Sequence, residues 1–242
     1  MARKIVVGDI HGALRGLEQL ISRIKPVYDD EFVFLGDYVD GWPDSAQVIE
    51  YLLAFSEKYS CTFILGNHDV WADEWLRGAP ANAVWLKHGG RETIESYSRV
   101  LNSDRHIHLA FYENLRHFVV DSKNRLFVHA GFSTDKGPAA DFKDGSYLWD
   151  RSLWEEALYL QASHPAANSS PRLSKFAEIF IGHTPVIFYD LEAPVHAQNL
   201  WNLDTGAGFD GRLSALDIES GKIWQSDPIP ALYPGIRGRI RH

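Results

Sequence analysis

The feature that most constrains this chain is a pattern that occurs five times: a short apolar run whose end carries glycine beside aspartate, asparagine or histidine. The first case is Ile5-Val6-Val7, which is followed directly by Gly8-Asp9-Ile10-His11-Gly12. The apolar run predicts a buried strand, and the glycines permit a tight turn and a close approach at its end. A single Asp-x-His triplet is common by chance, so it is the recurrence that carries information.

The other four runs end in similar segments. These segments are Gly36-Asp37-Tyr38-Val39-Asp40, Gly66-Asn67-His68-Asp69, His129-Ala130-Gly131 and Gly182-His183-Thr184-Pro185. Helical spacing of apolar residues over 14–24 and 45–59 separates the first three runs. Alternating strands and helices are typical of an α/β sheet, whose ligand crevice lies at the carboxyl ends of the strands. We therefore expect the polar side chains to meet at one edge.

The rest of the chain changes in character. Residues from about 71 to 117 show helical fragments, which indicates a helical insertion beside the crevice. For the histidines of this segment, surface or packing roles are the better interpretation. The second half is mostly β, with a hairpin around Lys123-Asn124 and closing strands at 200–203, 213–218 and 223–225. With no repeat or linker, one domain over residues 1–242 is expected.

Composition narrows the possible partners and location. The net charge of −8 disfavours nucleic acid and anionic membranes as partners. The basic end, Arg237 to His242, is interpreted as a solvated tail. The single cysteine, Cys61, fits a reducing compartment, and neither a cleavable leader nor a membrane span is recognisable, so a cytoplasmic location is expected. The sequence carries no signal for the oligomeric state.

The residue types at the five strand ends indicate a metal centre. Carboxylates, imidazoles and an amide oxygen, without a thiolate, suit a harder divalent ion than thiolate-zinc or iron–sulfur sites hold. Any one of these residues alone is better explained as an ordinary loop residue. Chance does not explain polar residues of this kind at five successive strand ends. The set exceeds what one ion needs, whereas two ions about 3.5–4 Å apart that share one carboxylate would use it fully.

Together the five segments resemble the sequence blocks of the calcineurin-like metallophosphoesterases, in the family's order and over residues from about 4 to 225. More narrowly, they are similar to the bacterial and phage members of the phosphoprotein phosphatase branch, to which diadenosine tetraphosphatases are related. The resemblance implies a four-layer α/β (α+β) fold, in which a central β-sandwich of two mixed sheets is flanked by helices. It also implies a dinuclear, metal-dependent phosphatase.

The resemblance further implies a role for each matching residue. The ligands of two divalent ions would be Asp9, His11, Asp37, Asn67, His129 and His183, with Asp37 shared. Mn²⁺ is the first expectation, with Fe or Zn²⁺ as alternatives, because nitrogen and oxygen ligands accept all three. A hydroxide bridging the two ions would attack phosphorus in line. His68 would be the general acid, held by Asp40, although a ligand or plain loop role for His68 is an alternative.

One block departs from the family pattern. The branch reads Gly-Asp-Tyr-Val-Asp-Arg-Gly, whereas here Gly41-Trp42 follows the second aspartate. The family's arginine grips the substrate phosphate with a bidentate fork, so its absence weakens the prediction of phosphate affinity. Arg151 resembles a second phosphate-binding arginine, with a surface ion pair as the alternative, and Arg91 is a weaker candidate. Trp42 would either stack on a substrate ring or simply pack.

These implications favour hydrolysis of phosphate monoesters, with serine/threonine phosphoproteins as the first substrate class. A bis(5'-nucleosyl)-tetraphosphatase of the symmetrical type is the alternative, because one catalytic centre serves both substrates and only the walls differ. The missing arginine and a possible role for Trp42 favour this alternative. An inactive phosphopeptide-binding module is disfavoured by the complete ligand set and by His68.

Overall fold

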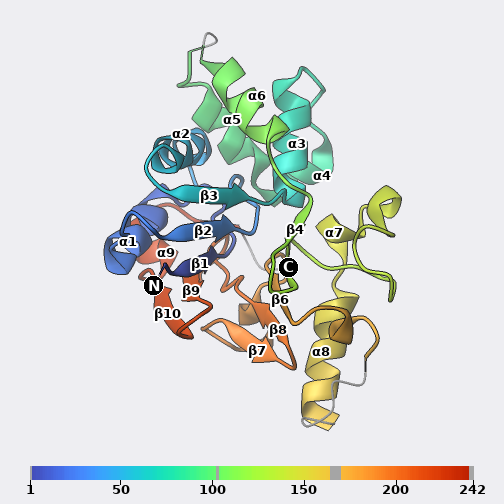
Figure 1. The fold of residues 1–242 in the computed structure, drawn as a ribbon. Coiled ribbons are helices and arrows are strands. Elements are labelled where there is room, and N and C mark those ends of the chain that lie inside the picture. Colours follow the sequence, from blue (N-terminus) through green and yellow to red (C-terminus); the bar gives the residue numbers. More distant parts are fainter. Residues whose placement is uncertain (1, 102–103, 164–169, 240–242) are drawn as a thin grey trace.

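Two five-stranded sheets form the centre of the protein in the computed structural model, which describes residues 2–101, 104–163 and 170–239 (Figure 1). The first sheet has the order β10-β9-β1-β2-β3. Its strands are β1 (Lys4–Val7), β2 (Glu31–Phe34), β3 (Ser60–Phe63), β9 (Ser214–Asp217) and β10 (Lys222–Gln225). The first three are parallel neighbours, and β9 runs antiparallel to both β1 and β10. The three parallel strands therefore place their carboxyl ends at one edge.

The second sheet, of order β4-β5-β6-β8-β7, is also mixed. Its strands are β4 (Phe118–Val120), β5 (Arg125–Val128), β6 (Glu178–Ile181), β7 (Val195–Ala197) and β8 (Leu200–Asn202). β5, β6 and β8 are parallel, whereas β4 and β7 pair antiparallel with β5 and β8. The predicted hairpin and closing strands are confirmed to within about two residues.

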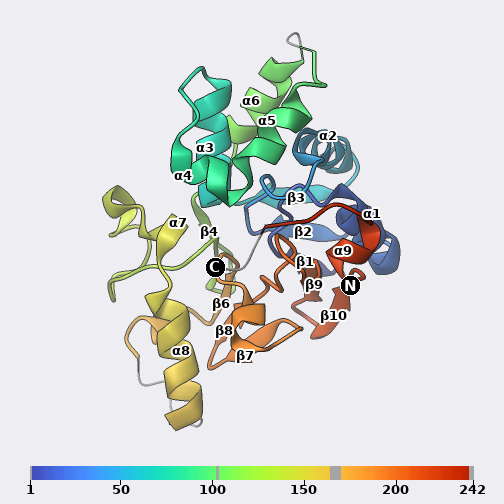
Figure 2. The ribbon, with the colours of Figure 1, turned by 180° about the vertical axis from the view of Figure 1, so that it is seen from behind.

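Helices cover the outer faces of the two sheets, as the front and back views show (Figures 1 and 2). Those beside the first sheet are α1 (Leu14–Ile24), α2 (Ser45–Ser56) and α9 (Ile229–Leu232). Beyond β3 lie α3 (Asn67–Leu76), α4 (Ala83–Trp85), η1 (Leu86–Gly90), α5 (Arg91–Tyr97) and α6 (Arg105–Glu113). The remaining helical segments are α7 (Ser146–Trp149), α8 (Ser152–Ser163), η2 (Phe142–Asp144), η3 (Leu173–Lys175) and η4 (Val186–Tyr189). The predicted sandwich of two mixed sheets flanked by helices is thus confirmed.

The alternation of side chains along each strand explains this layering. Val6 of β1 and Phe180 of β6 lie in one apolar cluster between the sheets. The neighbours Ile5 and Val7 point to the other face, where they join the cluster formed with the helices. Because both faces of each central strand are buried, a one-residue slip would misplace every side chain. The packing therefore fixes where the strands end, and with it the loops that follow.

No helix in the described ranges is long and apolar enough to cross a membrane.

Candidate metal centre

The loops after β1, β2, β3, β5 and β6 converge on one point between the two sheets. Two groups of buried residues meet there, and in each group one potential ligand atom per residue lies within 4.8 Å of the others. The groups are His11, Asp37, His68 and Asp37, His129, His183. Asp37 belongs to both, which is the arrangement that two ions sharing a carboxylate require.

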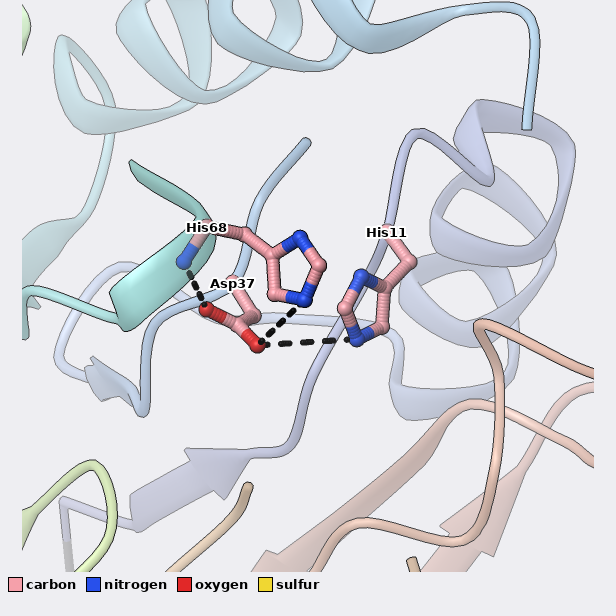
Figure 3. A group of neighbouring side chains, drawn as sticks. All are labelled: His11, Asp37 and His68. Carbon is pink, nitrogen blue, oxygen red and sulfur yellow. Dashed lines mark hydrogen bonds and ion pairs between the residues drawn. The ribbon is translucent and has the colours of Figure 1, made fainter. Parts of the chain in front are cut away.

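Asp37 contacts histidines of both groups, and its contacts with His11 and His68 are drawn in Figure 3. Its Oδ2 atom lies 3.6 Å from His11 Nε2 and 4.0 Å from His68 Nε2. Its Oδ1 atom lies 3.4 Å from His129 Nε2 and accepts a hydrogen bond from the His68 N–H at 3.0 Å. The two oxygens thus face different groups of imidazoles.

The imidazoles are held so that one ring nitrogen of each remains for the centre. His129 Nδ1 lies 2.8 Å from the Leu35 carbonyl, and His11 Nδ1 lies 3.1 Å from the carbonyls of Val39 and Asp40. Contacts with carbonyls place a proton on Nδ1, so the neutral ring that a metal binds has its lone pair on Nε2. This outer support is the usual arrangement around metal-binding histidines.

Asn67 completes the second group. Its Oδ1 atom lies 3.1 Å from His129 Nε2 and 2.9 Å from His183 Nδ1. Asp9 is tied to the same region, because its Oδ2 atom accepts the His183 N–H at 3.0 Å. The six residues expected as ligands therefore lie around one centre.

The unpaired atoms at this point test whether a cation fits. In the described part of the chain, three buried atoms here have no hydrogen-bond partner: Asp9 Oδ1, His183 Nε2 and Asp204 Oδ2. Leaving such groups unpaired costs about 1–3 kcal/mol each. All three can donate an electron pair to a metal, so the residues present fit a centre of divalent ions. Asp204, which we did not predict as a ligand from the sequence, joins the candidates.

Burial and mutual interaction shift the pKa values of these groups. Burial raises the pKa of Asp9, and the nearby Asp204 carboxylate raises it further. Burial would also raise the pKa of Asp37, but the imidazoles of His129, His68 and His11 hold it well below its usual value. Asp37 is therefore an anion surrounded by ring nitrogens, which is a suitable position for cations.

Two glycines in the blocks are needed for close approach. A Cβ atom added to Gly66 would lie 2.2 Å from Asp37 Oδ1, and one added to Gly182 would lie 2.0 Å from Asp9 Oδ1. Contacts this short cannot be relieved without moving a candidate ligand. Glycine at these strand ends therefore makes room for the carboxylates rather than for a special backbone angle.

Asp69, which we did not single out from the sequence, joins the second and third blocks. Its carboxylate accepts the N–H groups of Asp37 at 2.8 Å, Tyr38 at 2.9 Å and Gly66 at 2.9 Å. The side chain is completely buried, so no water can replace these bonds. Asp69 thus fixes the loop that carries the shared carboxylate.

Replacing Asp69 by Ala should lower the free energy of unfolding by about 3 kcal/mol or more. Three buried N–H donors would lose their acceptor, and each costs about 1–3 kcal/mol. Urea denaturation of the metal-free protein measures the change. Asp73→Ala on the same helix is the control, because it removes only a partly exposed ion pair with Arg77 and should cost less than about 1 kcal/mol. Equal losses in the two variants would contradict the role given to Asp69.

His68 forms a buried pair with Asp40. His68 Nδ1 lies 2.6 Å from Asp40 Oδ2, which also accepts the Trp85 indole N–H at 2.7 Å. Asp40 Oδ1 accepts the Thr93 hydroxyl at 2.5 Å. Burial raises the pKa of Asp40 and lowers the pKa of His68, so at neutral pH the pair holds one proton that Oδ2 and Nδ1 share. The donors from Thr93 and Trp85 favour the carboxylate form of Asp40, and both belong to the helical segment beyond β3.

A cavity of about 400 Å³ opens over the centre. Its wall includes an apolar and aromatic side, made by Trp71, Val84, Trp149, Pro185, Phe188 and Phe209. Lys87, His88, Arg151 and Arg239 supply ring nitrogens or positive charge. His88, interpreted from the sequence as a surface or packing residue, thus lines the cavity, with its ring 6.4 Å from that of Trp71.

The three predicted substrate-binding residues have different positions. Arg151 is exposed and lines the cavity, whereas Arg91 is exposed and does not line it. Trp42 is completely buried. Its indole donates to the Ala207 carbonyl at 2.7 Å and stacks on Tyr233 at 5.0 Å between ring centroids. Trp42 therefore packs in the core and offers no platform for a substrate, which corrects its assignment as a substrate-binding residue.

Comparison with known proteins agrees with this centre. A sequence model of the family described as calcineurin-like phosphoesterase matches residues 2–199. The bis(5'-nucleosyl)-tetraphosphatase PrpE (asymmetrical) of Bacillus thuringiensis is 29% identical over 252 residues, covering 98% of this chain and 97% of that protein. The same family was inferred from the five sequence blocks, and the match confirms it.

Solved structures share the fold. A protein serine/threonine phosphatase from Saccharomyces cerevisiae, with similarity to human phosphatase PP5, has a TM-score of 0.61 at 15% identity and covers 98% of this chain and 83% of its own. A metallophosphoesterase from Sphaerobacter thermophilus has a TM-score of 0.55 at 17% identity, covering 93% and 89%. At these identities the likeness concerns the arrangement of the two sheets.

Proposed function

Because this chain belongs to the calcineurin-like phosphoesterase family, and is therefore a metal-dependent hydrolase, we propose that its substrate is a dinucleoside polyphosphate. The observation that carries this choice is a pair of exposed aromatic rings on the cavity wall. Trp149 is 47% exposed and Phe188 is 49% exposed, and both border the cavity over the metal centre. The structural neighbours do not decide the substrate.

Aromatic rings at this place suit a nucleobase. Stacking of a base on an aromatic side chain contributes about 1–3 kcal/mol. Trp149 lies beside Trp71, with ring centroids 5.3 Å apart, so the wall extends over more than one ring. A phosphoserine peptide has no general need for such a surface. We therefore favour a dinucleoside polyphosphate over the phosphoprotein substrate that the sequence favoured.

The polar residues of the site would bind the metal ions, bind the phosphate chain and donate a proton. Asp9, His11, Asp37, Asn67, His129 and His183 would hold two divalent ions. When bound, these ions would lower the pKa of a coordinated water and neutralise phosphoryl oxygens. Arg151 would orient the phosphate chain through its guanidinium. His68, held by Asp40, would donate a proton to the leaving oxygen.

Rates on three substrates test the proposal. Metal-stripped protein should be inactive and regain turnover with Mn²⁺, and its kcat/KM should be at least about tenfold higher on diadenosine tetraphosphate than on a phosphoserine peptide or p-nitrophenyl phosphate. A higher value on the peptide would establish the phosphoprotein class instead. Absence of turnover with every divalent ion would establish a binding module. The products separate the two cleavage types, because symmetrical cleavage gives two ADP and asymmetrical cleavage gives ATP and AMP.

A variant of the wall sharpens this test. Trp149→Ala should raise KM for diadenosine tetraphosphate about tenfold, since a stacking surface is lost, and leave KM for inorganic pyrophosphate or another base-free substrate unchanged. Tyr159→Ala is the matched control, because Tyr159 is an exposed aromatic residue on α8 that does not line the cavity. Equal effects of Trp149→Ala on substrates with and without a base would contradict stacking.

A further inference from the structure

Arg239 reaches the metal centre from the far end of the chain. In the back view the C-terminal segment, in red, runs from α9 toward the middle of the molecule (Figure 2). The Arg239 N–H donates to the Gly208 carbonyl at 3.0 Å, and its guanidinium lies over the Phe209 ring at 4.7 Å. Its Nη1 atom is 3.3 Å from His11 Nε2. The expectation of a solvated tail is therefore wrong for Arg239, and residues 240–242 lie outside the described part.

Among the described residues, the Arg239 guanidinium has no close counter-ion. The acidic groups that act on it electrostatically are Asp37, Asp40, Asp204 and Asp9. Among the residues that the structure describes, none of these carboxylates forms an ion pair with it. A guanidinium has five N–H donors in a planar fork, and the described contacts use few of them. The remaining donors can bind a further anion, and such an anion would be more strongly favoured when dications occupy the centre.

The aliphatic part of Arg239 fills a specific space. A Cβ atom added to Gly41 would lie 3.2 Å from both Cγ and Cδ of Arg239. Gly41 has a φ of +113°, a backbone angle that an arginine would adopt only with strain. The side chain from residue 239 thus stands where a side chain from residue 41 would begin. Position 41 is also where the resemblance leads us to expect an arginine.

We propose that Arg239 takes the place of the missing arginine and binds a phosphoryl group of the substrate. This inference rests on the proposed phosphoesterase function and adds a binding residue to the same site. Phosphate is suited to the fork, because two parallel N–H···O bonds can form. The anion would also reduce the repulsion between the guanidinium and the metal ions.

The segment around Arg239 is adapted to this placement. A Cβ atom added to Gly238 would lie 2.6 Å from Trp42 Cζ2, so only glycine lets the chain cross the buried indole so closely. Trp42 cannot yield easily, because it is stacked on Tyr233 and hydrogen-bonded to Ala207. Gly41 therefore leaves room for the Arg239 side chain, and Gly238 lets the backbone pass close to Trp42. The buried Trp42 ring supports this segment.

Two measurements test the proposal: the binding of inorganic phosphate to Mn²⁺-loaded protein by calorimetry, and the Mn²⁺ content of each variant. Arg239→Ala should raise the Kd for phosphate about 10- to 100-fold without loss of Mn²⁺, and Arg239→Lys should give a smaller increase. Arg237→Ala is the matched control, because Arg237 is an exposed arginine of the same segment.

A second variant retains the Arg239 guanidinium but shifts its position. Gly238→Val should displace the tail from Trp42 and weaken phosphate binding as strongly as Arg239→Ala. Unchanged phosphate affinity in Arg239→Ala would overturn the proposal. Tighter Mn²⁺ binding and faster turnover in that variant would show instead that Arg239 blocks the ligand atom of His11. If the Mn²⁺-loaded natural protein binds no phosphate and hydrolyses neither diadenosine tetraphosphate nor a phosphate ester, the proposed function itself fails. Preference for a phosphopeptide would change only the substrate class.

Discussion

Asp37→Asn is expected to remove both metal ions and to lower turnover by at least about a thousandfold. The ions contribute several kcal/mol to the transition state, and each 1.36 kcal/mol is about tenfold in rate. Asn preserves the size of the side chain and can still accept the His68 N–H, which is 3.0 Å from Oδ1. It lacks the charge that two cations would share. Metal analysis after dialysis against Mn²⁺, together with kcat/KM on p-nitrophenyl phosphate, measures both effects.

The control for Asp37→Asn must separate loss of charge from loss of folding. Asp217 is also buried, but it lies in β9 opposite Ile5, away from the carboxyl end of β1. Asp217→Asn should therefore keep the metal content and activity of the natural protein. An Asp37→Asn variant that still binds two Mn²⁺ per chain would contradict the shared role of Asp37. Loss of metal in both variants would indicate a general effect of removing a buried charge.

The residues that could be predicted from the sequence follow directly from strand geometry. Ile5-Val6-Val7 is continuously apolar because both faces of β1 are covered, and Asp9 and His11 follow at the point where the strand must turn. The same reasoning applies to Asp37 and His129. Parallel pairing then brings separate loops to one edge without further information. For this reason the meeting of these polar side chains at one edge could be predicted from the pattern, whereas the two-sheet sandwich and the role of each ligand were implied by the resemblance to the calcineurin-like metallophosphoesterases.

Residues that act through long-range contacts could not be inferred in this way. Asp69 looks like one more polar residue in a helix start, and only the meeting of two loops shows that it holds three N–H groups. Thr93 and Trp85 reach Asp40 from a segment with no strand pattern. Arg239 belongs to a basic end that reads as solvated, and nothing local to it points to Gly41. Such contacts depend on tertiary packing and leave no periodic signal.

His68→Asn is expected to retain both metal ions and to slow the reaction, by about 10²–10⁴-fold on a substrate with a basic leaving group. The reason is that Asp40 holds His68 Nδ1 at 2.6 Å, while Nε2 faces the cavity that also contains Asp37. Asn cannot deliver a proton to a leaving oxygen at neutral pH. Phenyl phosphate and p-nitrophenyl phosphate measure this, because phenolate is the more basic leaving group and should suffer the larger loss.

The comparison of leaving groups distinguishes a proton donor from a metal ligand. His68 also lies within the group formed with His11 and Asp37, so a ligand role is the real competitor. A ligand would affect both phosphate esters equally and would lower the Mn²⁺ content, whereas a proton donor affects the poor leaving group selectively. Asp40→Asn should reproduce the selectivity in weaker form, because the imidazole would keep its place but lose the carboxylate that stabilises its charged state. Loss of Mn²⁺ in His68→Asn would show that His68 is a ligand of the first ion and not the proton donor. The general acid would then be one of the other residues that line the cavity.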